Sequence, residues 1–133
     1  MGGNGTFSKG HVLTEEQRQW RTLDTIPASD GFPEVVVVEM KNKKYSKTPE
    51  ESSTSNRVYA VFYPNGSDLK EISMYTNHMK TSVIHTEDHH GISPHYHNWS
   101  NGKQEKTAHH LTNYMKGLLK HVRDYKKIEY LNQ

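Results

Sequence analysis

The chain has 133 residues and a hydrophobic fraction of 32%, which fits a single domain over residues 1–133 with a modest core. It contains no cysteine, so disulfide bonds and thiolate chemistry are excluded. No apolar run is long enough to cross a membrane, and the formal net charge is only +2 at pH 7. We therefore expect a cytoplasmic protein with no membrane partner.

The N-terminal part predicts one helix and one strand between two polar segments. Residues 1–10 are rich in glycine and are expected to form a flexible arm. Thr14-Glu-Glu-Gln17 has the spacing of a capping box, which predicts a short helix over residues 15–23. The uninterrupted apolar run at residues 35–40 predicts a buried strand. Residues 41–56 are charged and show no periodicity, as expected of a surface loop.

The middle of the chain predicts a β-meander. Residues 57–63 read as a strand, and Pro64-Asn65-Gly66 after them is a strong turn signal. Alternation over residues 69–75 predicts a second strand. A third is expected over residues 80–85 and a short fourth over residues 94–99.

The C-terminal part predicts a helix over residues 111–125, since its apolar residues recur at helical spacing along one stripe, with Thr107 or Thr112 as the cap. The predicted fold class is therefore α+β, with residues 57–125 as the core. It is a small antiparallel β-sheet, a meander of about four to five strands, packed against a short N-terminal helix and a longer C-terminal helix.

A histidine-rich segment is the least random feature of the sequence. Residues 85–99 contain five of the ten histidines of the chain. Because side chains alternate along a strand, we expect His95, His97 and Trp99 to point to one side. If the third and fourth strands pair antiparallel, His85 lies near His95 or His97. Histidine changes its charge near neutral pH and its neutral ring binds metals.

Three interpretations of this segment stay open. In the first, His95 and His97 are a general base and acid, with His85 as a third catalytic group, and no cofactor is needed. In the second, His95 and His97 bind a divalent metal such as zinc together with Asp88 or His89, or with the alternatives His85 or His90. In the third, the histidines contact a partner or have no specific role.

The positive charge is concentrated at the C-terminus, where residues 103–133 hold seven Lys and Arg against three Asp and Glu. Such a basic helix suits nucleic-acid phosphates or an acidic protein, and equally a solvated face. The candidate phosphate-binding residues are Arg57, Lys80, Lys103, Lys116, Lys120 and Arg123.

Residues 57 to about 119 resemble a pattern of small proteins and C-terminal domains from phages and mobile elements of Gram-positive bacteria. The similar features are Val-Tyr-Ala-Val-Phe-Tyr-Pro-Asn-Gly, Leu-Lys-Glu-Ile-Ser, His-His-Gly-Ile-Ser-Pro-His-Tyr-His-Asn-Trp and a closing Leu-Thr helix. Several such domains are grouped with toxin-like nucleases of the barnase/EndoU/colicin/RelE type. The resemblance implies a small antiparallel sheet, metal-independent ribonuclease activity and a bacterial host cell. It carries over His95 and His97, with His85 as a neighbour.

The leading functional prediction is a nuclease-like, toxin-type domain that cleaves RNA by histidine acid–base chemistry. The predicted partner is RNA or a host nucleic-acid-handling protein, and a homo-oligomer is a further option. The alternative is a non-enzymatic accessory or anti-defence protein that inhibits a host or CRISPR-type nuclease or binds a nucleotide-like ligand. A second alternative is a metal-binding protein built on the histidine cluster.

Overall fold

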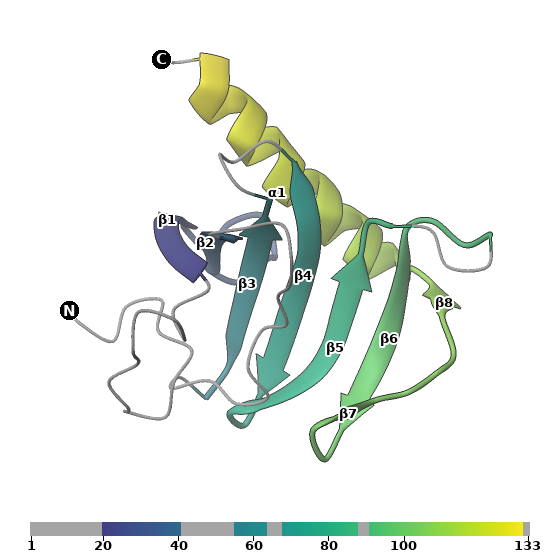
Figure 1. Cartoon of the computed structure of the whole chain (residues 1–133). Coiled ribbons are helices and arrows are strands. Elements are labelled where there is room, and N and C mark those ends of the chain that lie inside the picture. The colour runs from purple at the N-terminus through teal and green to yellow at the C-terminus, as the bar shows by residue number, and fades with distance from the viewer. Residues whose placement is uncertain (1–19, 41–54, 64–67, 88–90, 132–133) are drawn as a thin grey trace.

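The computed structural model describes residues 20–40, 55–63, 68–87 and 91–131, and in them one β-sheet carries a single helix on one face (Figure 1). The sheet has eight strands in the order β1-β2-β3-β4-β5-β6-β7, and β8 pairs with β6. The elements are β1 (Trp20–Ile26), β2 (Val35–Met40), β3 (Arg57–Phe62), β4 (Leu69–Thr76), β5 (Met79–His85), β6 (His95–Ser100), β7 (Lys103–Gln104), β8 (His109–His110) and α1 (Asn113–Leu131).

The sheet is mixed, because β2 and β3 run parallel while the other neighbouring strands are antiparallel. A parallel pair needs a crossover of about a dozen residues or more. The segment between β2 and β3, residues 41–56, supplies that length. The predicted surface loop falls on this segment, and residues 41–54 of it lie outside the described residues. The predicted arm, residues 1–10, and the predicted turn at residues 64–66 lie outside them as well.

The predicted α+β class with two helices is wrong, as is the prediction of a purely antiparallel sheet of about four to five strands, because β1 and β2 extend the sheet and β2 pairs parallel with β3. The meander predicted over residues 57–99 is confirmed, since β3, β4, β5 and β6 pair antiparallel in chain order. The fold is mostly β-sheet, and α1, at the C-terminus, is the one helix among the described residues. Residues 20–23, the end of the predicted N-terminal helix, belong to β1, and residues 15–19 lie outside the described part. The capping box is a local signal, whereas β1 forms because β2 offers it a partner from Ile26↔Val35 to Trp20↔Met40. Tertiary pairing overrides the local preference here.

Other elements confirm the sequence-based predictions. The strand predicted over residues 35–40 is β2 with the same bounds, and β3, β4, β5 and β6 match their predicted ranges to within about a residue or two. The predicted helix is α1, which begins at Asn113. Thr112 is its cap, since the Met115 amide donates a hydrogen bond to Thr112 Oγ1 at 3.1 Å.

The two faces of the sheet carry different side chains. One face packs against α1. Its buried apolar residues, including Val37, Ala60, Ile72 and Ile84, form one cluster with Leu118 and Val122 of the helix. The opposite face carries a second apolar cluster on β2, β3 and β4, formed by Val36, Val38, Met40, Tyr59, Val61 and Tyr75. On β4, β5 and β6 this opposite face becomes polar. This polar part contains His85, His95 and His97.

The packing of α1 depends on the absence of a side chain at Gly117. A Cβ atom at this position would lie 2.9 Å from Cζ of Phe32. The Phe32 ring stacks on His121, with ring centroids 4.9 Å apart, so it has little freedom to move away.

We predict that Gly117→Val lowers the free energy of unfolding by about 1–2 kcal/mol, because overpacking outweighs the gain in helix propensity. Chemical denaturation measures the change. The double variant Gly117→Val/Phe32→Leu should be destabilised by less than the sum of the two single variants. Strict additivity would show that the Phe32 ring is not the obstacle.

Candidate functional site

Strand register gathers the polar residues of β4, β5 and β6 into one patch. Glu71 pairs with His85, and His85 pairs with His95. Directly paired residues point to the same face of an antiparallel sheet. The next pairs on that face are Ser73 with Val83 and Val83 with His97.

His85, His95 and His97 form a compact cluster, called here the histidine triad. The ring centroids of His85 and His95 lie 5.1 Å apart in a stacked arrangement. His97 is edge-on to both, at 5.6 Å from His85 and 5.0 Å from His95. The prediction that His85 lies next to His95 and His97 is confirmed. Their catalytic role stays a prediction.

The three histidines differ in access to solvent. His95 and His97 are buried, with exposed fractions of 4% and 2%, while 21% of the His85 side chain is exposed. Burial lowers the pKa of His85 to about 4, although Glu71 opposes this shift. The neighbouring His95, Lys70 and His97 lower it further. His85 is therefore neutral at pH 7.

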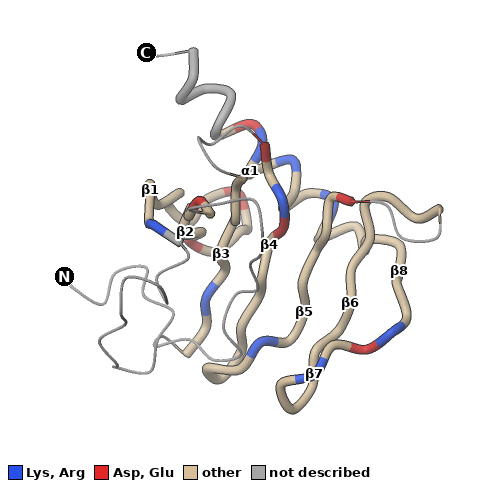
Figure 2. Tube along the Cα trace, in the orientation of Figure 1, with Lys and Arg blue, Asp and Glu red and all other residues tan. Residues whose placement is uncertain are grey.

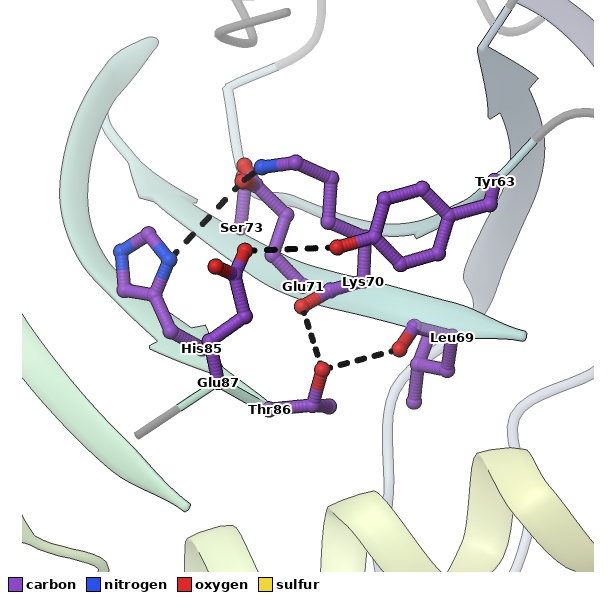
Figure 3. A network of polar contacts seen from close by, with 8 residues as sticks. All are labelled: Tyr63, Leu69, Lys70, Glu71, Ser73, His85, Thr86 and Glu87. Carbon is purple, nitrogen blue, oxygen red and sulfur yellow. Dashed lines mark hydrogen bonds and ion pairs between the residues drawn. The ribbon is translucent and has the colours of Figure 1, made fainter. Parts of the chain in front are cut away.

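Glu71 is the centre of a polar network beside the triad (Figure 3). Its carboxylate is buried, and Lys70 Nζ lies 2.7 Å from Oε1. Ser73 Oγ donates a hydrogen bond to Oε2 at 3.2 Å. His85 Nδ1 lies 4.0 Å from Oε1. Burial acts to lower the pKa of the Lys70 ammonium, but Glu71, together with smaller contributions from Tyr63 and Glu87, raises that pKa, so Lys70 stays charged.

The segment after β5 closes one side of this network. Thr86 Oγ1 donates hydrogen bonds to the carbonyl oxygens of Leu69 and Lys70, at 2.9 and 3.0 Å. Tyr63 Oη donates to Glu87 Oε1 at 3.3 Å (Figure 3). These contacts fix Glu87 next to Lys70 and Glu71.

A pocket of about 250 Å³ opens over the network. His85 is the one member of the triad among its lining residues. Lys80 enters it from the start of β5. This lysine is buried, and its Nζ lies 4.1 Å from the centroid of the Trp99 ring, a cation–π contact. The lining residues are Lys70, Glu71, Lys80, Val83, His85, Glu87, Trp99 and Gln104.

Of the six candidate phosphate-binding residues, the structure places only Lys80 in this pocket. Arg57 contacts Glu34, with its Nη1 3.3 Å from Oε1, and its guanidinium lies over the Tyr59 ring. Lys103 is exposed on β7. Lys116, Lys120 and Arg123 lie on α1, away from β7 (Figure 2).

Sequence reasoning missed Glu71 and Lys70. Glu71 stands alone as an acid within a strand whose neighbours Leu69, Ile72 and Ser73 are buried. A carboxylate among buried strand positions is rarely without a partner. That signal was available in the sequence.

The described residues do not form a metal site of the kind that the second interpretation expects. Among the described residues, no group of three or more His, Asp or Glu side chains is placed to hold a metal ion. Three of the predicted ligands, Asp88, His89 and His90, lie outside the described residues. Metal binding therefore stays a prediction.

Comparison with protein-family models, with curated proteins and with solved structures gave no match. The resemblance to phage-borne, toxin-like nucleases therefore stays a prediction. No helix within the described residues is long and apolar enough to cross a membrane.

The depressed pKa of His85 predicts a specific pH dependence of stability. The unfolded chain protonates this residue near the ordinary pKa of 6.5, whereas the folded protein does so only near a pKa of about 4. Neutral His85 therefore contributes fully to the free energy of unfolding above pH 6.5, and this contribution is lost as the pH falls to about 4. The free energy of unfolding lost in this way is about 3 kcal/mol.

Urea denaturation at several pH values measures this effect. His85→Asn has no group that titrates, so its unfolding free energy should fall less between pH 7 and pH 4 than that of the wild type. Parallel curves for the two proteins would contradict the assigned pKa.

Proposed function

We propose that the protein cleaves RNA by acid–base chemistry in the pocket formed by β4, β5, β6 and β7. One observation supports this most directly. A neutral imidazole, His85, and a carboxylate, Glu71, lie side by side at the pocket, with Lys70 and Lys80 among its lining residues.

RNA cleavage of this kind needs a base for the 2′-hydroxyl and positive charge for the phosphate. Neutral His85 accepts the 2′-hydroxyl proton at Nδ1, the nitrogen nearest Glu71. The 2′-oxygen bonds to phosphorus, and the bond from phosphorus to the 5′-oxygen breaks. That oxygen takes a proton from water. The products are a 2′,3′-cyclic phosphate and a 5′-hydroxyl, and His85 then releases its proton to solvent.

The other pocket residues stabilise the charges that form. Glu71, whose Oε1 lies 4.0 Å from Nδ1, stabilises the positive charge of the His85 imidazolium. Lys70 and Lys80 counter the negative charge that builds up on the phosphate. The Trp99 ring offers a surface on which a base stacks.

His95 and His97 have a different role in this proposal from that in the sequence prediction. They are buried and do not line the pocket. His95 stacks on His85, so these two residues position the imidazole that acts on the substrate.

His85→Asn should lower the rate of RNA cleavage at least about 100-fold, because it removes the base. The matched control is His78→Asn, since His78 is exposed in the β4–β5 turn at a positive φ of 70° that asparagine tolerates. Cleavage of a labelled oligonucleotide, with identification of the cyclic phosphate, measures both variants. Full activity in His85→Asn would place the chemistry elsewhere.

The pH–rate profile separates His85 from an ordinary histidine. Protonation removes the base, so kcat/KM should fall on the acid side near pH 4 instead of near 6.5. An acid limb at pH 6.5 would exclude His85 as the base.

A second candidate is a protein that binds a nucleotide-like ligand without cleaving it. Lys70 already neutralises Glu71, and Lys80 lies against Trp99, which suits an anionic aromatic ligand. Quenching of tryptophan fluorescence by a nucleotide, with no cleavage of RNA at any pH, would favour this candidate.

A further inference from the structure

A second concave site lies next to the start of β6, between that strand and α1. It is a groove of about 420 Å³ between α1 and the segment that leads into β6. We call it the α1 groove and define it by six of its lining residues: Pro94, His110, Lys116, Leu119, Lys120 and Arg123.

The rim of the α1 groove is cationic. Lys116, Lys120 and Arg123 are spaced at i, i+4 and i+7, which places them on one face of the helix, and all three are exposed. Lys120 forms an ion pair with Asp124, so Lys116 and Arg123 supply most of the positive charge of the rim. Among the described residues that line the groove, none is acidic.

The floor of the groove is apolar. Leu119 and Leu111 are buried there, with exposed fractions of 5% and 8%. An apolar floor beneath a cationic rim suits a nucleotide, whose base covers the floor while its phosphates meet the rim. The apolar stripe of α1 is turned into the core at Leu118 and Val122. Among the described side chains of α1, Tyr114 is the one large apolar residue that is exposed, and a single ring is not an apolar face that could insert into a lipid surface.

The groove and the catalytic pocket lie at two ends of one short segment. Glu87 lines the pocket and Ser93 lines the groove. Ser93 Oγ donates a hydrogen bond to the Thr86 carbonyl oxygen at 3.2 Å, which joins the two ends. A residue that lines the groove, Ser93, is thus within hydrogen-bond distance of Thr86, which directly precedes the pocket residue Glu87.

We propose that the α1 groove binds single-stranded RNA, holding one base and its flanking phosphates next to the segment in the pocket. The placement of the bound RNA segment relative to the cleaved bond rests on the proposed function. Binding of RNA in the groove does not rest on it, because binding requires no cleavage.

The test uses a fluorescent single-stranded oligonucleotide with 2′-O-methyl groups, which lacks the nucleophile and stays intact. Lys116→Gln and Arg123→Gln each remove one exposed charge. Lys106→Gln removes one from an exposed position between β7 and β8 and is the matched control. Fluorescence anisotropy over a series of salt concentrations gives the affinity and its salt slope.

We expect each groove variant to weaken binding several-fold and the double variant at least about tenfold. The salt slope should decrease by about 0.7 for each phosphate that the protein no longer neutralises. Lys106→Gln should bind like the wild type. Equally weakened binding in Lys106→Gln would overturn the proposal in favour of a general charge effect. Unchanged binding in the double variant, or groove-dependent binding only to anionic lipid vesicles, would also overturn it.

The proposed function and the groove are tested separately. A dinucleotide has a single phosphate, and in this proposal that phosphate lies in the pocket, so its cleavage should be unchanged in the double variant. Groove-dependent binding without any cleavage would remove the proposed function and leave the groove proposal intact.

Discussion

The register of β4, β5 and β6 is the constraint on which the candidate site depends. Glu71, His85 and His95 form one row across three strands because Glu71 pairs with His85 and His85 with His95. A slip of one residue on β5 would turn His85 toward α1 and bring Ile84 into the polar patch. The apolar alternation prevents this, since Ile72 and Ile84 are paired and both buried in the core beneath α1. The core of the sheet thus fixes the geometry of the opposite face.

The polar patch is costly to the fold. Buried imidazoles lose hydration, and His85 Nε2 is a buried atom with no hydrogen-bond partner among the described residues. Much of this cost is avoided because His85 stays neutral. The cost of removing the Glu71 carboxylate from water is offset by its contacts with Lys70 and Ser73. A row of apolar residues on this face would give a more stable sheet. Buried titratable groups with perturbed pKa values, gathered at a pocket, are a physical reason to look for function there.

Much of this arrangement is predictable from local sequence. Alternation put His95 and His97 on one side of a strand, because the period of a strand does not depend on its partners. Placing His85 beside them also required the assumption that the third and fourth strands pair antiparallel, which they do. The identity of β1 was not predictable in this way, since its pairing with β2 is a tertiary choice against a local helix signal. The parallel pairing of β2 with β3 also has no local signature. The separation of Arg57 from the histidines follows from strand order, which short-range patterns do not encode.

The positive charge that Lys80 brings to the pocket does not follow from strand alternation. In a regular strand, residues 83 and 85 share one face and residue 80 lies on the other. The register of β4 and β5 shifts between Met74 and Tyr75, so that Tyr75 pairs with Lys80 and Thr81 is left out of the pairing. Thr81 Oγ1 donates a hydrogen bond to the Met74 carbonyl oxygen at 3.2 Å across this irregularity. The bulge turns Lys80 onto the histidine face and against Trp99. Bulges commonly re-aim a side chain near a functional site, and here one additional residue moves a cation from the α1 side of the sheet to the pocket.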